Sequence, residues 1–303
     1  MLMSDNVVRK ITAAEGDALR AELESAGFDF REQQYTRYSA RGPGVSVSVY
    51  TSGKLVVQGK GALEFAATYL GGGGSGGVGT AGAAVAACDA VTEPIIGTDE
   101  SGKGDYFGPL VVAAVLLRPE DVEVLRTLGV RDSKTVSDKA ALEIAEVIQT
   151  GYGDRVAVVS IGPRRYNELH AKFGNNLNRL LAWAHARAIE DVLEEHECGR
   201  ALSDKFANER LILDALMERG RTLKLDQRVR AESHPAVAAA SIVARARFLR
   251  ELERLGFDVG EKLPKGAGNL VDVAARRIHR SGGLDALRDI AKLHFRTTEK
   301  ARG

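Results

Sequence analysis

A run of glycine and alanine, GGGGSGGVGTAGAAVAACDA at 71–90, interrupts the chain. Such a segment buries too little apolar surface to offset the entropy lost when it is ordered, so we predict a flexible linker. The linker separates two segments, 1–70 and 91–303, of a chain with 303 residues. A chain of this length is long enough to form two domains, and we expect one domain on each side of the linker.

The first segment reads as a small α+β domain. Apolar residues recur on one face of an expected helix at 14–26. The stretch VSVSVY at 45–50 alternates apolar and polar residues, which predicts a half-buried strand. A turn at Ser52-Gly53 leads into a return strand, and a second helix is expected over GALEFAATYL.

The second segment alternates apolar strand patterns with helical patterns. The expected strands are 94–99, 109–117, 155–161, 200–204 and 221–226, and the expected helices lie near 137–149, 176–197, 208–219, 235–255, 270–281 and 284–291. This mixture predicts a layered α/β domain in which helices pack on a sheet.

Composition says more about the cellular compartment of this protein than about its function. The net charge is only +1, so any surface for nucleic acid must come from local clustering. Cys88 and Cys198 are not spaced like zinc ligands and suit a reducing compartment. The start of the chain lacks the apolar stretch of a signal peptide, and no run approaches the roughly 20 apolar residues of a membrane span. We expect a cytoplasmic protein without membrane contact and, since no heptad repeat is visible, a monomer.

The strongest candidate for a chemical site is GTDESGKGDYFGPL at 97–110. An apolar strand runs into Asp99 and Glu100, and glycines follow at once. Hard cations prefer oxygen ligands, and glycine lets a substrate backbone approach closely. Successive strand residues face opposite ways, so we expect the chain to bend after Asp99 if both acids serve one site. Taken alone, an Asp-Glu pair at a strand end is usually a solvated edge.

The glycines do not indicate a nucleotide cofactor. The stretch 102–107 breaks the G-x-G-x-x-G pattern of dinucleotide-binding folds, and Lys103 is not followed by the Ser or Thr of a phosphate-binding Walker loop. Two further acids stand at element ends. Asp204 closes a short apolar strand, and Glu232 precedes a helix that Pro235 would begin. Glu232 could equally be a capping acid, which the helix dipole stabilises.

Several blocks of this chain resemble ribonuclease HIII, a bacterial type 2 ribonuclease H. Besides the block at 97–110, they are RDSK at 131–134, SDKFA at 203–207, AESHPAVAAASIVAR at 231–245, LPKGA at 263–267 and AKLHFRTTEK at 291–300. They follow the order of that family across nearly the whole second segment. The first segment is similar to the family's TATA-binding-protein-like N-terminal domain, chiefly over YTSGKLVVQGKG.

The resemblance implies a ribonuclease H-like mixed sheet flanked by helices, with the small α+β domain in front of it. It implies an endonuclease that hydrolyses the RNA strand of RNA/DNA hybrids and leaves 5′-phosphate and 3′-hydroxyl ends. Its four metal-binding catalytic carboxylates would be Asp99, Glu100, Asp204 and Glu232, with Glu209 as the rival for the fourth position. Clustered carboxylates repel one another, so charge also predicts divalent cations, and we expect two Mg²⁺ or Mn²⁺ ions during catalysis.

Recognition of RNA must depend on the 2′-hydroxyl, and we expect backbone amides of Ser101, Gly102, Lys103 and Gly104 to contact it. The Lys103 side chain would more naturally meet a phosphate. Further candidates for substrate contact are Tyr106, His234, Ser133 and Lys134, each of which could instead be structural or solvated.

Two basic regions are candidates for duplex binding. Residues 262–303 hold ten Lys or Arg against four Asp or Glu, although solvated helix faces would explain them as well. In QQYTRYSAR, alternation places Tyr35, Arg37 and Arg41 on one side of a strand. An aromatic-plus-arginine face suits a nucleic-acid backbone, so we predict that residues 1–70 hold the substrate and that deleting 1–85 raises KM more than it lowers kcat.

Two alternatives stay open at the level of sequence. A ribonuclease HII-like enzyme would cut at single ribonucleotides embedded in DNA, but that family has Asp at the position of Glu232 and Arg at the position of Lys103. A non-catalytic hybrid-binding protein would use the same fold. The intact set of acids argues against it.

Overall fold

The computed structural model describes residues 6–32, 36–51, 53–70, 91–130, 136–205, 208, 210–217, 219–229 and 231–303. The chain divides into two compact units. The first comprises Met1–Ala90 together with Glu120–Gly129, and the second comprises Val91–Pro119 and Val130–Gly303.

The first unit contains an antiparallel sheet with the strand order β1-β5-β4-β3-β2. Its strands are β1 (Asn6–Lys10), β2 (Asp29–Arg31), β3 (Thr36–Gly42), β4 (Val45–Tyr50) and β5 (Lys54–Gln58). Two helices, α1 (Ala13–Ser25) and α2 (Ala62–Tyr69), supply Leu19, Leu23 and Phe65 to a core with one face of this sheet. The helix α1 begins at a capping box, in which Thr12 and Glu15 satisfy each other's backbone amides. The α+β reading of this segment is confirmed.

Burial in β4 is deeper than its alternating pattern predicts. Ser48 is 5% exposed and Tyr50 is 1% exposed, so residues on both faces of this strand are covered. A helix that the sequence pattern did not predict, α3 (Asp121–Leu128), belongs to the same compact unit and contacts β1. Lys54 Nζ donates a hydrogen bond to the carbonyl oxygen of Leu128.

The second unit contains a mixed sheet with the order β10-β9-β6-β7-β8. Its strands are β6 (Ile95–Ser101), β7 (Leu110–Leu117), β8 (Val156–Ile161), β9 (Arg200–Asp204) and β10 (Lys224–Arg228). The pairs β6–β9 and β9–β10 are parallel, and the pairs β6–β7 and β7–β8 are antiparallel. The prediction of a mixed sheet flanked by helices is therefore confirmed.

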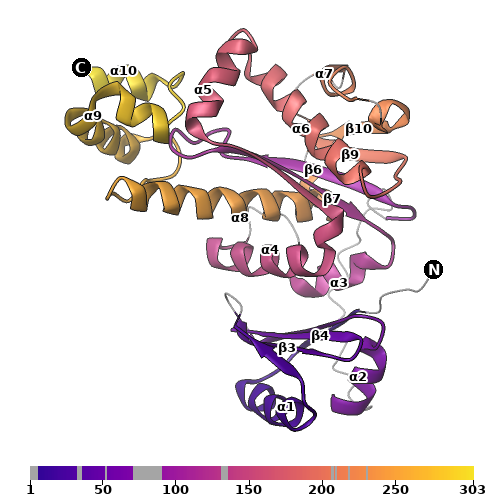
Figure 1. The fold of residues 1–303 in the computed structure, drawn as a ribbon. Coiled ribbons are helices and arrows are strands. Elements are labelled where there is room, and N and C mark those ends of the chain that lie inside the picture. Colours follow the sequence, from indigo (N-terminus) through magenta and orange to yellow (C-terminus); the bar gives the residue numbers. More distant parts are fainter. Residues whose placement is uncertain are drawn as a thin grey trace. The chain divides into compact units, whose positions relative to one another are not determined.

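Helices cover both faces of this sheet (Figure 1). The long helix α8 (Pro235–Asp258) packs on β6 and β7 from one side, and α6 (Leu177–Leu193) packs on β7 and β8 from the other. The remaining helices are α4 (Asp138–Tyr152), α5 (Pro163–Lys172), α7 (Arg210–Leu213), α9 (Asn269–Ile290) and α10 (Arg296–Arg302). Gly283, with φ of 68°, interrupts α9, which accounts for the two separate helices expected in this region. In the described part of the chain, no helix is both long and apolar enough to cross a bilayer.

The contact between α8 and β6 is unusually close. A Cβ added to Gly97 would lie 2.1 Å from the backbone carbonyl carbon of Ala236. All five alanine and valine residues of the first turn and a half, 236–240, are at most 1% exposed. Small side chains on the helix and the missing side chain at Gly97 let the two backbones approach. This contact fixes the start of α8 beside the end of β6.

The expected helix at 208–219 is largely wrong. Among the described residues of this range, α-helix is present only at Arg210–Leu213, and a 3-10 turn follows at Arg219–Thr222. The buried carboxylate of Glu190 accepts hydrogen bonds from the amides of Met217 (2.7 Å) and Gly220 (2.9 Å). A tertiary contact from α6 thus holds this segment in a loop that its local sequence does not indicate.

Candidate active site

A pocket of about 210 Å³ lies at the end of β6 in the second unit. Its lining contains four carboxylates, two hydroxyls and one guanidinium, from Asp99, Glu100, Ser101, Asp204, Glu232, Ser241 and Arg245. All four acids selected from the sequence are therefore brought to one cavity. They come from three separate places in the chain, namely β6, the end of β9 and the short 3-10 turn Ala231–Ser233.

Strand pairing explains why the pocket forms here. The parallel ladder between β6 and β9 ends at the pair Thr98 and Ser203, one residue before Asp99 and Asp204. On the other side, β6 stays paired with β7 as far as Ser101. The two strands thus separate where their acidic residues begin, and the carboxyl ends of parallel strands leave an open crevice at such a point.

The expected bend after Asp99 is wrong, because β6 continues without interruption to Ser101. Asp99 and Glu100 instead leave the strand on opposite faces, as alternation requires. Asp99 shares the face of Gly97 and interacts with Ser241 of α8, whereas Glu100 accepts from His185 of α6. Both carboxylates still line the pocket because it opens at the strand's unpaired edge, which both faces border.

The two neighbouring acids have very different affinities for protons. Burial, reinforced by the charge of Glu100, raises the pKa of Asp99 from 3.8 to about 7. Burial alone would raise the pKa of Glu100 too, but the hydrogen bond from His185 and the charge of Lys103 outweigh it and lower this pKa to about 2. Mutual repulsion between buried carboxylates is the physical condition that a divalent cation relieves.

The donor set fits a hard cation such as Mg²⁺ or Mn²⁺, because the pocket offers carboxylate and hydroxyl oxygens and no thiol or imidazole on its wall. The acids are near one another without being fully assembled. Among the residues that the structure describes, no three Asp, Glu, His or Cys side chains already form a group that would hold an ion.

Asp204 and Glu232 are connected through the backbone. Asp204 Oδ1 accepts a hydrogen bond from the amide of Ala231 at 3.1 Å, so the end of β9 holds the 3-10 turn that carries Glu232. The cap of α8 is His234, whose Nδ1 accepts from the amide of Ala236 at 3.3 Å. The capping role considered for Glu232 thus belongs to His234, and His234 lies buried at the helix start instead of lining the pocket. Glu209, the rival acid, is outside the described residues.

Of the four loop residues expected to contact substrate, 101–104, only Ser101 is part of the pocket lining. Gly102 has φ of 86°, and a Cβ there would lie 2.2 Å from the carbonyl oxygen of Pro109, so only glycine fits. Gly104 faces open space, with no atom within 4 Å of a Cβ built on it. Lys103 Nζ forms an ion pair with Glu100 Oε1 at 3.2 Å.

Tyr106 is not in the cleft, and the expectation that it contacts substrate is wrong. Its side chain is fully buried, and its hydroxyl is 3.2 Å from Thr298 Oγ1. The ring packs edge-on against Phe107 and Phe295. A large apolar ring with an internal partner for its hydroxyl gains more from this burial than from exposure in a polar crevice.

A buried lysine, Lys292, holds the loop from behind. Its Nζ donates hydrogen bonds to the carbonyl oxygens of Asp105 at 2.8 Å and Gly108 at 2.7 Å, and the side chain is 0% exposed. The Asp105 carboxylate in turn accepts from the amide of Gly266 at 2.6 Å, which ties the loop to the segment that contains Lys265.

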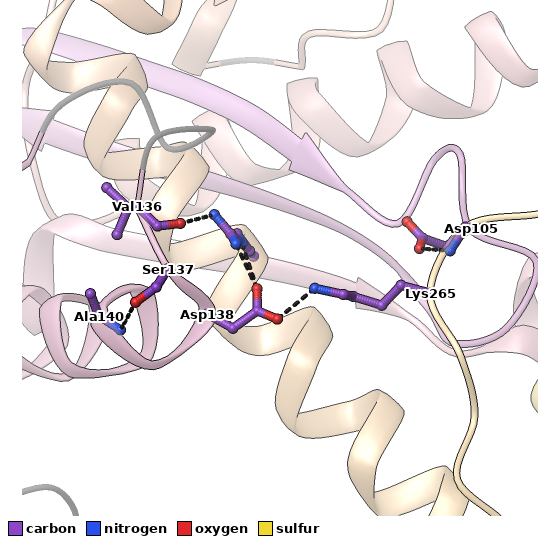
Figure 2. A network of polar contacts seen from close by, with 8 residues as sticks. Asp105, Val136, Ser137, Asp138, Ala140 and Lys265 are labelled. Carbon is purple, nitrogen blue, oxygen red and sulfur yellow. Dashed lines mark hydrogen bonds and ion pairs between the residues drawn. The ribbon is translucent and has the colours of Figure 1, made fainter.

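Arg245 places a positive charge on the pocket wall and is itself held by Asp138. Its Nη2 donates to Asp138 Oδ1 at 2.6 Å, and its Nη1 donates to the carbonyl oxygen of Val136 at 2.8 Å. Figure 2 shows Lys265 reaching the other oxygen of Asp138. Asp138 therefore bridges two cations near the site. Ser133 and Lys134, just before this network, lie outside the described residues.

In the first unit, the expected aromatic and arginine face is not formed as predicted. Tyr35 lies outside the described residues. The β3–β4 register shifts between Thr36 and Tyr38, so Arg37 is the extra residue of a β-bulge. Its guanidinium turns to α1, where it donates to Asp17 Oδ1 at 2.6 Å. Arg37 and Arg41 therefore do not share one side of the strand, because the bulge reverses the alternation.

The sequence reasoning overlooked four residues of this region, namely His185, Ser241, Arg245 and Lys292. A local signal existed for two of them. Ser241 and Arg245 are spaced i,i+4 on α8, within the block AESHPAVAAASIVAR, so they project from one face of the helix beside Glu232. His185 and Lys292 are distant in sequence from every acid, and only the packing of α6 and the C-terminal segment places them here.

Comparison with known proteins gives consistent results over the whole chain. The family model described as Ribonuclease HII matches residues 96–298, and a domain of unknown function, DUF3378, matches residues 6–72. The protein named Ribonuclease HIII from Protochlamydia amoebophila is 40% identical over 95% of this chain and 93% of its own length. Its counterpart from Chlamydia abortus is 40% identical over 97% of both chains.

Solved structures agree with these relatives. The crystal structure of Bst-RNase HIII in complex with Mn²⁺ superposes with a TM-score of 0.66 and 34% identity, and the match covers 98% of each chain. Aquifex aeolicus RNase H3 gives a TM-score of 0.54 at 28% identity, over 95% of this chain and 99% of that one.

Proposed function

The chain belongs to the ribonuclease HIII family, and from this premise we propose that it cleaves the RNA strand of RNA/DNA hybrids at the pocket of four carboxylates. Membership makes it a ribonuclease H, an endonucleolytic hydrolase. The single observation that carries the assignment of the site is the convergence of Asp99, Glu100, Asp204 and Glu232 on one cavity.

Divalent cations are the proposed cofactors. The oxygen donors of the pocket and the raised pKa of Asp99, which burial and the charge of Glu100 cause, both favour a bound cation. When bound, two ions would supply an activated water and stabilise the leaving oxygen of an in-line displacement. A relative of similar fold has been crystallised with Mn²⁺, which supports Mn²⁺ or Mg²⁺ as the choice.

Each carboxylate has a distinct proposed role. The charges of both Glu100 and Asp204 act on Asp99, which makes it our choice for the ligand shared by two ions. Glu100 and Asp204 flank it, and Glu232 reaches the pocket from the 3-10 turn before α8. Arg245 on the same wall offers a positive charge to the scissile phosphate. Attack of water on phosphorus with departure of the 3′-oxygen would leave 5′-phosphate and 3′-hydroxyl ends.

Selection of RNA is proposed to depend on the loop after β6. Ser101 lines the pocket, Gly102, Lys103 and Gly104 follow it directly in the chain, and a Cβ on Gly104 would meet no atom within 4 Å. Backbone amides there can donate to a 2′-hydroxyl, which is the group that distinguishes RNA from DNA. The bound Lys103 ammonium lies 3.2 Å from Glu100 and would meet a phosphate near the same place.

The first unit is proposed to hold the hybrid while the second unit cleaves it. Arg41 is exposed on β3, on the sheet face opposite the core residues Tyr38 and Ala40. Tethering such a surface to the catalytic unit would raise its effective concentration near the substrate. Tyr35 keeps its proposed role in contacting the duplex.

A cleavage assay tests the proposed function. A duplex with a labelled RNA strand paired with DNA is incubated with the full-length protein and Mg²⁺, with Mn²⁺, or with chelator, beside the same RNA as a single strand. We expect cleavage of the hybrid only when a divalent cation is present, and products that a ligase accepts because of their end groups. Cleavage that persists in chelator would refute the metal requirement.

A further inference from the structure

His185 is the one fully buried histidine ring in the described residues that bonds to a carboxylate of the pocket. It lies on α6, on the opposite side of the sheet from α8. Its Nδ1 is 2.9 Å from Thr98 Oγ1, and its Nε2 is 3.2 Å from Glu100 Oε2. Thr98 and Glu100 are two residues apart on β6, so their side chains share the face that α6 covers.

The partners of the ring nitrogens suit both of them. An ionised carboxylate only accepts hydrogen bonds, so Nε2 of His185 carries the proton directed to Glu100. Nδ1 faces the Thr98 hydroxyl, which can either donate to it or accept from it. This assignment leaves every buried polar atom of the series with a matching partner. It also allows only one orientation of the imidazole ring.

Two side chains bind the Glu100 carboxylate, and one of them is held much more rigidly than the other. Lys103 binds Oε1, but its side chain is 38% exposed and belongs to a loop. His185 binds Oε2, has a side chain that is 0% exposed and stands on a helix of 17 residues. A long, flexible glutamate side chain held by a rigid buried donor loses its freedom before any ligand arrives.

We propose that His185 is a positioning residue that, with Thr98 behind it, orients the Glu100 carboxylate toward the pocket for a divalent cation. The proposal rests on the proposed function, in which Glu100 is a metal ligand. His185 does not touch the cation or the substrate. His185 contributes by fixing the direction of the Glu100 carboxylate. Replacing His185 should therefore weaken the affinity for the cation more than the affinity for the duplex.

The test measures Mn²⁺ binding to the full-length protein without substrate, by calorimetry, together with kcat and KM on a labelled hybrid. His185→Leu removes the donor and keeps an apolar side chain in the buried space. His185→Gln retains an amide N–H near the position of Nε2. Thr98→Val removes only the hydroxyl behind the ring. His196→Leu is the matched control, because His196 bonds to the Asp154 carbonyl away from the pocket.

We expect His185→Leu to weaken Mn²⁺ binding by about 10- to 100-fold, the range for residues that orient metal ligands. His185→Gln should recover most of the affinity, Thr98→Val should lose several-fold, and the control should match the parent protein. KM for the hybrid at saturating metal should change little. In a Glu100→Gln background, His185→Leu should cause no further loss of Mn²⁺ affinity, because the carboxylate through which His185 is proposed to act has already been removed.

Several outcomes would overturn the proposal, and they separate it from the function on which it rests. If His185→Leu and Thr98→Val both bind Mn²⁺ like the parent protein, His185 does not position Glu100. If His185→Leu fails to fold, parent-like Mn²⁺ affinity in Thr98→Val would overturn the proposal, because loss of the hydroxyl behind the ring should weaken binding several-fold. If Glu100→Gln itself retains both cleavage and Mn²⁺ affinity, the proposed function of the pocket fails instead.

Discussion

Gly97 and Ala236 are in direct backbone contact, since a Cβ on Gly97 would lie 2.1 Å from the Ala236 carbonyl carbon and 2.4 Å from its oxygen. This contact joins β6 to α8 two residues before Asp99 and four residues after Glu232. The distance between two of the proposed metal ligands therefore depends on the absence of a side chain at a residue that never meets substrate.

Replacing Gly97 with Ala should move α8 away from β6 and destabilise the protein. Overpacking of this kind costs about 1–3 kcal/mol of unfolding free energy, and here the obstacle is backbone, which yields less easily than a side chain. Cleavage should fall as well, because Glu232 moves with α8. Gly104→Ala is the control for stability, since a Cβ there meets nothing within 4 Å. Chemical denaturation followed by circular dichroism measures both variants, and equal midpoints would contradict the argument.

Loss of the proposed central ligand should separate catalysis from binding. Asp99→Asn removes the charge and keeps the shape, so cleavage should fall below about one thousandth of the parent rate because the cation loses its shared ligand. Hybrid affinity, measured by fluorescence anisotropy in the presence of Ca²⁺, should stay within a few-fold. A variant that still cleaves would show that the site is placed wrongly.

The fourth carboxylate can be identified by a matched pair of substitutions. Glu232→Gln should abolish most activity, because Glu232 lines the pocket with the other three acids. Glu209→Gln should leave kcat within a few-fold of the parent. The measurement is kcat at saturating Mn²⁺ for both variants. The reverse result would transfer the fourth position to Glu209.

Metal binding should release a proton from Asp99 in acidic solution. Burial and the charge of Glu100 raise the pKa of Asp99 from 3.8 to about 7, so below pH 7 the folded, metal-free protein holds a proton that the unfolded chain has lost above pH 4. The free energy of unfolding of the metal-free protein should therefore fall as pH rises from 4 to 7, and Mn²⁺ affinity should rise over that range and then level off.

Calorimetry in buffers of different ionisation enthalpy checks this linkage. Release of about one more proton per protein is expected at pH 6 than at pH 8.5 on binding of Mn²⁺. Asp99→Asn removes the titrating group and should show no such difference. Equal proton release at both pH values in the parent protein would contradict the raised pKa.

The two arginines of β3 should behave differently. Arg41 is exposed on the face proposed for the duplex, so Arg41→Glu should raise KM several-fold with little change in kcat. Arg37 is engaged with Asp17 on the helix side, so Arg37→Ala should leave KM nearly unchanged. Steady-state kinetics on a labelled hybrid decides between them. A larger KM effect from Arg37 would mean that the bulged residue faces the substrate.

Much of the fold follows from local pattern, and the exceptions have identifiable causes. The strands of the second sheet and the hairpin β4–β5 of the first were predictable, because apolar alternation and continuous apolar runs are strong signals. The strand β1 was not predicted. The short helices α3, α5 and α10 were not predicted, because helices of seven to ten residues contain too few turns for a clear apolar periodicity. The segment after α7 departs from its helical pattern because Glu190, far away in sequence, captures its amides.

The site was predictable as a set of acids but not as a geometry. Asp99, Glu100 and Asp204 stand at strand ends, a position that sequence reveals. Sequence does not reveal that β6 stays paired with β7 as far as Ser101, whereas its pairing with β9 ends at Thr98. Because of this pairing, Asp99 and Glu100 project from opposite faces of an unbent strand and still line one pocket. Tyr106 illustrates the opposite error, because a residue within a strongly matched block proved to be core.

The buried side chain of Lys292 has a mechanical consequence for recognition. Its Nζ donates to the carbonyl oxygens of Asp105 and Gly108 from inside the protein, and these hydrogen bonds oppose movement of the loop that follows β6. A loop restrained in this way adjusts little to the shape of a bound duplex. If this loop contacts the duplex as proposed, we expect the bending or change of sugar pucker needed for a fit to take place in the nucleic acid, so that stiff duplexes are cleaved less well.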